Sequence, residues 1–320
     1  MPKTLQIFDE PLELVVEQRS FSVDHVVVLD LRRPEGGDLP EWTPGAHIVL
    51  RLDGDDLVRE YSLCGDPSNR EIWRIAVALA EDGRGGSQHV HLRLHEGTVV
   101  EVSRLTNLFR FEPSARPLFV AGGIGITPIL PMIAAASHGG WDWNLLYLGK
   151  DRAHMPFTGE LEALGNKVII AESSVQGRVD LDAYVAENRE AHFFVCGPEG
   201  LIAEMEDIAR REQVSLSVER FIPRITEMPT FEAPFEVVVE STGQRVTVNP
   251  DQTTLEALLG AGITVPNSCG QGTCGSCETG VLAGVPDHRD SILSDDERAE
   301  NDCMYVCVSR SLSRSLTLEL

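Results

Sequence analysis

The sequence lacks any long hydrophobic run and is poor in basic side chains. It has 27 Lys and Arg residues against 50 Asp and Glu, for a formal net charge of −23. Phosphate binding requires a basic face, so nucleic acid is disfavoured as a partner, and an anionic membrane surface is disfavoured for the same reason. No apolar stretch approaches the length of a membrane span, and the N-terminus lacks the apolar core of a signal peptide. We therefore expect a cytoplasmic protein that has neither nucleic acid nor a membrane as partner.

Internal repeats and low-complexity tracts are also absent. With 320 residues and 42 % hydrophobic content, the chain is long enough for two or three domains with sizeable cores. Its seven cysteines suit a reducing compartment, because nothing in the sequence indicates export to an oxidising one.

Four of the cysteines form a tight trio and one distant member. Cys269, Cys274 and Cys277 are separated by four and then two residues, and Cys307 follows near the C-terminus. This spacing matches the ligand pattern of a plant-type [2Fe–2S] cluster. Three glycines interleave with the trio, as expected for a loop that needs positive φ angles and turns its N–H groups toward the sulfurs.

Two other interpretations of these cysteines are a zinc site and a disulfide pair. Structural zinc usually has two short Cys/His pairs as ligands, and a four-residue gap inside a trio is atypical of that arrangement. A disulfide requires an oxidising compartment. The pattern therefore favours the cluster, with Cys269, Cys274, Cys277 and Cys307 as the iron ligands.

Residues 1–112 are predicted to be rich in β-structure, because short β-branched runs alternate with turn-forming segments, a pattern typical of a small barrel. One run contains Arg59, Tyr61 and Ser62. The guanidinium offers a fork to phosphate, the ring a flat contact, and the hydroxyl a hydrogen bond to a ring nitrogen. Together they are suited to a phosphorylated planar cofactor. The alternative is an edge-strand Arg/Tyr pair without a ligand.

A glycine-rich loop follows, with Gly85, Gly86 and Ser87 just before a predicted helix. Such a loop is a ready anion site, because free N–H groups and the helix dipole face the ligand. The alternative is a flexible turn.

Residues 113–222 alternate short apolar strands with helical segments, which predicts a doubly wound α/β domain. The first strand is followed by Gly122, Gly123 and Gly125. The pattern departs from the standard dinucleotide fingerprint, because a proline stands where its third glycine would be. A strand, tight loop and helix in this order still present a helix N-terminus to a pyrophosphate.

The residues around this loop give two further expectations. Thr127 is predicted to be the N-cap of the helix and Pro128 its first residue. Cys196, Gly197 and Pro198 follow a later strand, at the strand end where ligands bind in doubly wound sheets. The alternative for Cys196 is a buried core thiol.

If the ligand of this loop is a nicotinamide dinucleotide, the preference for NADH or NADPH depends on groups near the adenosine ribose. Lys150 and Arg152 would attract a 2′-phosphate, whereas Glu172 would repel it and hold a free 2′-hydroxyl. We favour NADH.

The last third begins with a proline-rich segment at 223–233, predicted to be an interdomain linker. Residues 234–320 then show a hairpin and a capping box at Thr253 and Glu256. Their order of elements is β-grasp-like. The acidic run Ser294–Glu297 is either a docking surface for a basic partner or a solvated helix start.

Several of these motifs resemble one superfamily. The Arg59–Leu63 segment followed by Gly-Arg-Gly-Gly-Ser is similar to the flavin barrel of the ferredoxin–NADP reductase superfamily, and Gly122–Pro128 is similar to its nicotinamide-binding half. The resemblance implies that Ser62 lies near flavin N5 and that Phe221 packs against the flavin. It also implies these flavin contacts: Arg59, Tyr61, Ser62, Gly85, Gly86 and Ser87.

The same resemblance implies the nicotinamide site. Cys196 would help to position the hydride donor beside the flavin, and we place Ser62, Thr127 and Cys196 in the catalytic set. The implied nicotinamide contacts are Gly122, Gly123, Gly125, Thr127, Cys196, Gly197 and Pro198.

Over essentially its full length, the chain resembles the phthalate dioxygenase reductase family. The resemblance implies a multidomain fold: a β-barrel flavin domain at 1–112, a doubly wound α/β nucleotide domain at 113–222, a linker at 223–233 and an α+β ferredoxin domain of β-grasp type at 234–320. The implied cofactors are FMN, NADH and the [2Fe–2S] cluster, with the domain order favouring FMN over FAD.

The leading hypothesis is the reductase component of a Rieske-type aromatic oxygenase or O-demethylase, because a flavin converts a hydride into the single electrons that a cluster accepts. A second hypothesis keeps this chemistry and replaces the partner by a cytochrome P450 or another acceptor. A third is a non-enzymatic redox sensor.

Overall fold

The computed structural model describes residues 4–53, 57–80, 83–222 and 233–320. Most of the predicted linker at 223–233 lies outside the described residues.

By compactness the chain divides into two units, Met1–Arg220 and Phe221–Leu320. No helix in the described part of the chain is long and apolar enough to cross a membrane.

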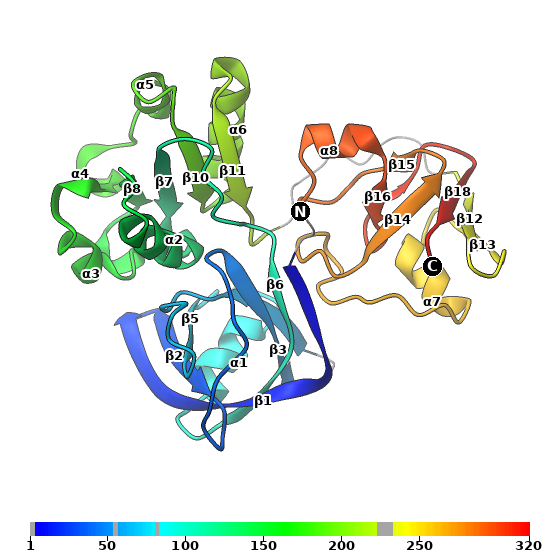
Figure 1. Ribbon diagram of the computed structural model, residues 1–320, viewed down its shortest axis with the longest axis horizontal. Coiled ribbons are helices and arrows are strands. Elements are labelled where there is room, and N and C mark those ends of the chain that lie inside the picture. The colour runs from blue at the N-terminus through cyan, green and yellow to red at the C-terminus, as the bar shows by residue number, and fades with distance from the viewer. Residues whose placement is uncertain (1–3, 54–56, 81–82, 223–232) are drawn as a thin grey trace. The chain divides into compact units, whose positions relative to one another are not determined.

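The first unit begins with an antiparallel sheet that closes into a barrel (Figure 1, blue to cyan). The strand order is β4-β3-β6-β1-β2-β5. The two edge strands meet where Leu63 pairs with Ile75, and the Cys64 N–H donates to the Arg74 carbonyl at 2.9 Å. The predicted barrel is confirmed. Its elements are β1 (Thr4–Val23), β2 (Val26–Arg32), β3 (Ala46–Asp53), β4 (Leu57–Ser62), β5 (Trp73–Ala78), α1 (Gly86–Arg93) and β6 (Val99–Asn107).

Strand β2 explains why its sequence is continuously apolar. Val27, Leu29 and Leu31 point into the barrel core, whereas Val26 and Val28 belong to a second core on the other face. Because successive side chains of a strand point to opposite faces, a strand buried on both faces has no polar alternation.

The second core lies between the barrel and a parallel five-stranded sheet (Figure 1, green). Its strand order is β11-β10-β7-β8-β9, with β7 central, which is a doubly wound arrangement. The sheet is confirmed, but its fifth strand, β11, is absent from the prediction, which ends the domain on a helix. The elements are β7 (Pro117–Gly122), α2 (Ile126–His138), β8 (Asn144–Gly149), α3 (Thr158–Glu162), β9 (Val168–Glu172), α4 (Ser173–Gln176), α5 (Leu181–Ala186), β10 (His192–Cys196), α6 (Glu199–Glu212) and β11 (Ser215–Glu219).

The two faces of this sheet have different neighbours. Phe119 and Ala121 of β7 share a core with α2 and with Phe109, which follows the barrel. Leu118 and Val120 face the other way and share a core with α5 and α6. The carboxyl end of β7 is therefore fixed between two packed layers.

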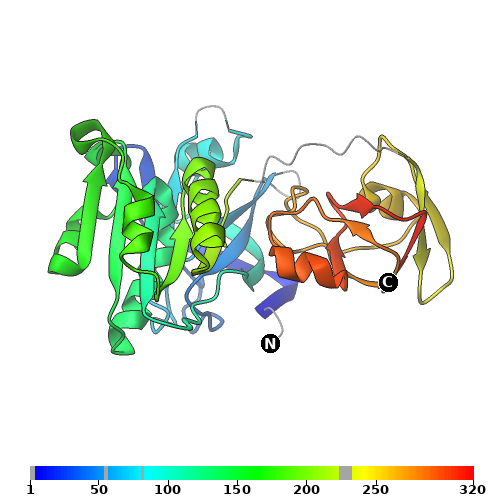
Figure 2. The same ribbon diagram turned by 90° about the horizontal axis from the view of Figure 1, so that it is seen from above.

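The second unit is a mixed five-stranded sheet in the order β13-β12-β18-β14-β16 with two short helices (Figure 2; α8 is the orange helix). Parallel pairing of the first and last long strands, β12 and β18, gives the predicted β-grasp arrangement. The elements are β12 (Phe235–Val239), β13 (Arg245–Val248), α7 (Thr254–Gly260), β14 (Glu278–Ala283), β15 (Pro286–Asp287), α8 (Asp295–Glu300), β16 (Cys303–Tyr305), β17 (Arg310–Ser311) and β18 (Ser315–Leu318).

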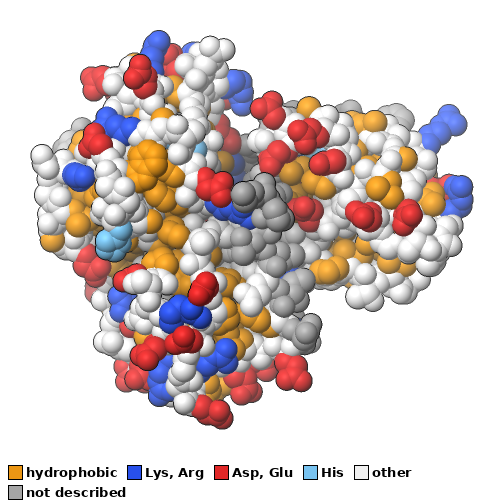
Figure 3. All heavy atoms as spheres, viewed as in Figure 1, with side chains coloured by type: hydrophobic (Ala, Val, Ile, Leu, Met, Phe, Trp, Pro, Cys, Tyr) orange, Lys and Arg blue, Asp and Glu red, His pale blue; other side chains and the backbone are white. Residues whose placement is uncertain are grey.

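Local sequence signals in this unit are confirmed. Thr253 and Glu256 form the predicted capping box of α7. Ser294 and Glu297 form a second one at α8, so the acidic run is a helix start. Figure 3 shows carboxylates spread over the visible surface of this unit, including the region of α8.

Candidate functional site

The loops that follow β7 and β10 touch each other at the carboxyl edge of the parallel sheet. A Cβ on Gly125 would lie 2.3 Å from the Cys196 carbonyl oxygen, and one on Gly197 would lie 3.0 Å from the Gly122 Cα. A Cβ on Gly122 would meet the Pro198 ring at 2.6 Å. Only glycine permits this approach, and it brings the two loops together at the sheet edge where a helix N-terminus can hold a pyrophosphate.

The predicted N-cap at Thr127 is wrong. Helix α2 begins at Ile126, its N-cap residue is Gly125, and a 3₁₀ turn of Gly123–Gly125 leads into it. The Thr127 hydroxyl instead donates back to the Ile124 carbonyl at 3.0 Å. Gly123–Gly125 form a 3₁₀ turn in place of an irregular loop, and α2 follows it directly. The helix therefore starts two residues before the position that the Thr-Pro pair predicts.

A cavity of about 600 Å³ opens beside these loops. Gly122, Gly123 and Pro198 line it on one side and Lys150 on another. Of the predicted nicotinamide contacts, Gly122, Gly123 and Pro198 line the cavity, whereas Gly125, Thr127, Cys196 and Gly197 are not among its lining residues. The cavity is large enough for part of a dinucleotide.

Two of the residues predicted to distinguish NADH from NADPH at the adenosine ribose, Arg152 and Glu172, form an ion pair with each other. The Arg152 guanidinium lies 2.9 Å from the Glu172 carboxylate and 2.7 Å from that of Glu162. The Arg152 N–H also donates to Glu172. Lys150 lines the cavity without taking part in this network.

The two predicted flavin segments lie against each other in the barrel. The Arg59 guanidinium donates to the carbonyls of Val58 and Arg84, and a Cβ on Gly86 would lie 2.5 Å from the Arg59 side chain. Gly85 is the N-cap of α1 with φ 80°, and no side chain caps the helix. A cation and an uncapped helix N-terminus are thus adjacent, which fits a phosphate. The Ser87 hydroxyl accepts from the Ala80 N–H at 3.0 Å, which ties the loop to the segment that follows β5.

Ser62 provides a test of whether the site fits a flavin ring. It is 6 % exposed, and its hydroxyl has no hydrogen-bond partner among the described residues. A buried hydroxyl without a partner is costly, and a ligand ring nitrogen would satisfy it. Tyr61 is half-buried against the barrel core, and burial raises the pKa of its phenol.

A row of polar side chains next to Ser62 was not predicted. His47 pairs across the sheet with Ser62 on one side and with Thr106 on the other. The His47 imidazole lies 3.9 Å from the Glu219 carboxylate at the end of β11. Burial, with a smaller contribution from the charge of Glu60, raises the pKa of Glu219 to about 8. The sequence offered one signal for this row, the acidic Glu219 two positions before Phe221. It lies in β11, a strand that the sequence analysis does not predict.

Cys196 lies at the end of β10, pairs with Glu219 across the sheet, and is 0 % exposed. Its thiol belongs to the core on the barrel side, and burial followed by Glu219 raises its pKa well above the ordinary value. It is therefore a neutral thiol facing the barrel, suited to contact a ring and not to act as a thiolate. Phe221 is 43 % exposed and begins the second compact unit.

All four predicted iron ligands converge. The Cys269 thiol is within hydrogen-bonding reach of those of Cys274 and Cys307, and Cys277 is within reach of Cys307. These contacts lower the pKa of Cys269 and of Cys277 and raise that of Cys307, which donates to both. Thiolates held together this way are the donor set of an iron–sulfur or zinc site.

The loop around these thiols favours a cluster. The Gln271 N–H and the Thr273 hydroxyl donate to the Cys269 sulfur at 3.3 and 3.4 Å. The Ser276 hydroxyl lies 3.0 Å from the Cys274 sulfur. Hydrogen bonds to sulfur stabilise its negative charge and are one of the levers on cluster potential.

Comparisons with known proteins agree with this donor set. A family model for the 2Fe-2S iron-sulfur cluster binding domain matches residues 237–312, which include all four cysteines. Phenoxybenzoate dioxygenase subunit beta from Ectopseudomonas oleovorans is 38 % identical over 314 residues, covering 97 % of this chain and 98 % of the relative. The solved phthalate dioxygenase reductase, described as modular for electron transfer from pyridine nucleotides to [2Fe-2S], is 32 % identical with a TM-score of 0.69, covering 98 % of each chain. The chain belongs to the phthalate dioxygenase reductase-like family.

As a member of this family, the protein is a nicotinamide-dependent flavin and iron–sulfur oxidoreductase. The predicted cofactor classes and fold are confirmed. A second solved structure, an intact type IV self-sufficient cytochrome P450 monooxygenase, is 35 % identical with a TM-score of 0.90, covering 97 % of this chain and 41 % of that one. The present chain thus spans about two fifths of that larger protein.

Proposed function

We propose that this reductase takes electrons from NADH and passes them through FMN and the [2Fe–2S] cluster to a Rieske-type aromatic oxygenase or O-demethylase. The observation that carries the proposal is the presence, in one chain, of the dinucleotide loops, the unsatisfied Ser62 hydroxyl and the four converging thiols. When bound, the flavin accepts a hydride and releases single electrons.

Each part of the chain has a distinct role in this scheme. The edge-to-edge contact of Gly122 with Gly197 presents backbone N–H groups to the pyrophosphate. Arg59 and the α1 N-terminus hold the flavin phosphate, while Ser62 donates to the flavin ring. The neutral, fully buried Cys196 thiol would keep the core under the nicotinamide site apolar and free of water. Thr127 would hold the turn before α2 in shape, because its hydroxyl donates to the Ile124 carbonyl.

The NADH preference rests on Glu172. Its carboxylate occupies the Arg152 guanidinium, which would otherwise be available to a 2′-phosphate. Glu172→Gln should lower the ratio of kcat/KM for NADH over NADPH by roughly tenfold. The Arg152 guanidinium would lose its contact with Glu172 and gain one with the 2′-phosphate, and an interaction of about 1.4 kcal/mol corresponds to a factor of ten. Glu162→Gln is the matched control, because it also releases Arg152 from one partner but leaves Glu172 in place. An unchanged ratio in both variants would remove Glu172 as the discriminator.

The choice of FMN over FAD follows from the resemblance in domain order. Denaturing the purified protein and separating the released flavin by chromatography tests it directly. FAD as the released flavin would overturn the FMN assignment without affecting the electron path.

The partner is tested by reconstitution. With NADH, the reductase should support substrate turnover by a purified Rieske-type oxygenase at a rate limited by reductase concentration. The high similarity to the reductase part of a self-sufficient P450 favours a P450 as the second candidate. Turnover with a P450 and none with any Rieske oxygenase would decide for the second candidate. We also propose a cytoplasmic location, because none of the seven cysteines forms a disulfide.

A further inference from the structure

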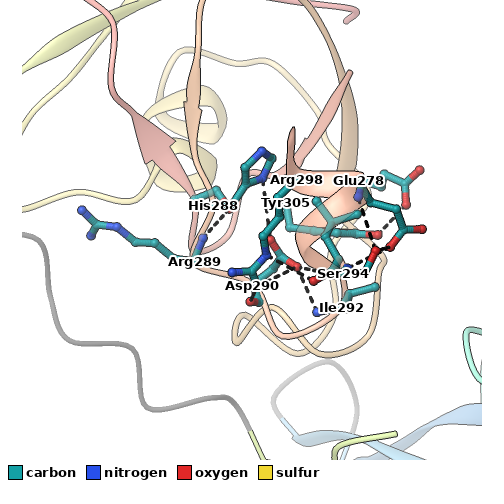
Figure 4. Close-up of polar contacts among 11 residues, drawn as sticks. Glu278, His288, Arg289, Asp290, Ile292, Ser294, Arg298 and Tyr305 are labelled. Carbon is teal, nitrogen blue, oxygen red and sulfur yellow. Dashed lines mark hydrogen bonds and ion pairs between the residues drawn. The ribbon is translucent and has the colours of Figure 1, made fainter. Parts of the chain in front are cut away.

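Asp290 is a fully enclosed carboxylate in the second unit, outside the four ligands. It is 0 % exposed. One of its oxygens, Oδ1, accepts from the N–H groups of Ile292 and Leu293 at 2.9 and 2.8 Å. The other, Oδ2, has no hydrogen-bond partner among the described residues. Figure 4 shows Asp290 at the centre of these contacts.

Asp290 forms part of the wall behind the cluster loop. A Cβ on Gly272 would lie 3.0 Å from the Asp290 Cα and 2.6 Å from the Val308 side chain. The neighbouring Ser291 N–H donates to the Gly272 carbonyl at 2.9 Å. Gly272 is two residues from Cys274, and Val308 directly follows Cys307. The Asp290 segment is therefore wedged between the two loops that carry the ligands.

Other hydrogen bonds hold the segment in this place. The Arg289 N–H donates to the Ser309 hydroxyl at 3.2 Å, which ties it to the loop after Cys307. From α8, the Arg298 guanidinium donates to the Asp290 carbonyl at 2.6 Å. The carboxylate is thus fixed in distance from both ligand loops.

We propose that Asp290 places a buried negative charge behind the cluster loop and so lowers the reduction potential of the cluster. Reduction adds an electron to the cluster, and a fixed carboxylate nearby opposes that addition. This inference rests on the proposed cluster site. A lower potential favours onward transfer of the electron to the acceptor.

The charged and titratable groups around Asp290 decide whether the net charge near the cluster is negative or positive. Arg298 lies 4.0 Å from Oδ1 and is 19 % exposed, so water screens its positive charge more than that of the enclosed carboxylate. His288 lies 3.9 Å from Oδ2, and neither of its ring nitrogens has a hydrogen-bond partner among the described residues. Arg289 is paired with Asp287 at 2.8 Å, so these two largely cancel.

Asp290→Asn is the main test, because an amide oxygen can still accept from Ile292 and Leu293 while the charge is removed. We measure the midpoint potential of the purified holoprotein by redox titration with EPR detection. The reduction equilibrium should shift about tenfold toward the reduced cluster, which is about 59 mV for a one-electron couple. Asp251→Asn is the matched control, since it removes the same charge at an exposed position of this unit where water screens it, and it should leave the potential near the wild-type value.

A second variant guards against failed cluster assembly. Arg298→Gln removes the opposing charge and should shift the potential downward, opposite to Asp290→Asn. A cluster-loaded Asp290→Asn protein with an unchanged potential overturns the inference, as does a null or upward shift in Arg298→Gln if the first variant does not load. Absence of a rhombic [2Fe–2S] signal in the wild type would instead contradict the proposed function.

Discussion

Two regions of the molecule depend on glycine for different physical reasons. At the nucleotide edge, Gly122, Gly125 and Gly197 have ordinary φ angles, but a Cβ on any of them would strike another loop at 3.0 Å or less. In the cluster loop, Gly270 has open space around it and a φ of +65°. The first region needs glycine for close approach between segments, and the second for a left-handed backbone.

The difference shows what a glycine-rich pattern can reveal. A positive φ is a local property, so the spacing of glycines among the cysteines predicts it. Close approach depends on a partner loop far away in the sequence, which no local pattern contains. The glycines of the nucleotide edge should therefore be the less tolerant of substitution.

The largest effect is expected for Gly125→Ala. Its Cβ would lie 2.3 Å from the Cys196 carbonyl oxygen, so a strand end must move. Flavin reduction by NADH should slow by about 100-fold, the usual cost of misplacing a binding group by about 1 Å. Stopped-flow absorbance measures this rate. Gly159→Ala is the control, because nothing lies within 4 Å of its Cβ, and a near wild-type rate is expected there.

Gly272→Ala should come next, because it combines both reasons. Its φ is +68°, and its Cβ would lie 2.6 Å from the Val308 side chain. We expect most of the cluster to be lost while the flavin still bleaches with NADH. Iron and sulfide content per flavin measures this loss. Full cluster occupancy in the variant would show that the close approach of Gly272 to Val308 and Asp290 is not needed.

Gly270→Ala separates the two reasons, since only the φ of +65° opposes it. The cost should be about 1–2 kcal/mol of unfolding free energy, the penalty of a left-handed conformation for a residue with a Cβ. Chemical denaturation followed at the cluster absorbance measures it. A loss of cluster equal to that of Gly272→Ala would mean that φ alone governs the loop.

A pH dependence of stability is expected from Glu219, independent of the glycines. The folded state raises its pKa from 4.5 to about 8, so folding favours the protonated form. This contribution is fully present below about pH 4.5 and is lost as the pH rises through 8. Glu219→Gln cannot ionise, so its stability relative to the wild type should increase from pH 5 to pH 8. A constant difference between the two proteins across that range would contradict the raised pKa.

Much of the fold could be predicted from the sequence because its signals are local. The capping box at Thr253 and the short β-branched runs of the barrel strands depend on residues a few positions apart. The four cysteines are distant in part, yet iron chemistry restricts their spacing enough to be recognised. The N-cap at Thr127 failed because an unforeseen 3₁₀ turn shifts the helix start by two residues.

The remainder of the site depends on contacts between distant segments. His47, Ser62 and Thr106 come together through strand register, and Glu219 joins them from a strand whose short sequence, SLSVE, has no strong pattern. Nothing in the sequence distinguishes Asp290 from a surface carboxylate, and only the structure shows that it is fully buried. Register and enclosure are properties of the assembled chain, so these residues could not be identified beforehand.

The central claim is that the chain accepts electron pairs from NADH and stores single electrons at its cluster. The most direct measurement is an anaerobic titration with NADH, followed together by flavin absorbance and by EPR. We predict an endpoint near about 1.5 equivalents of NADH per chain, two electrons for the flavin and one for the cluster, with a rhombic [2Fe–2S] signal. An endpoint at about 1.0 equivalent with no such signal would contradict the account.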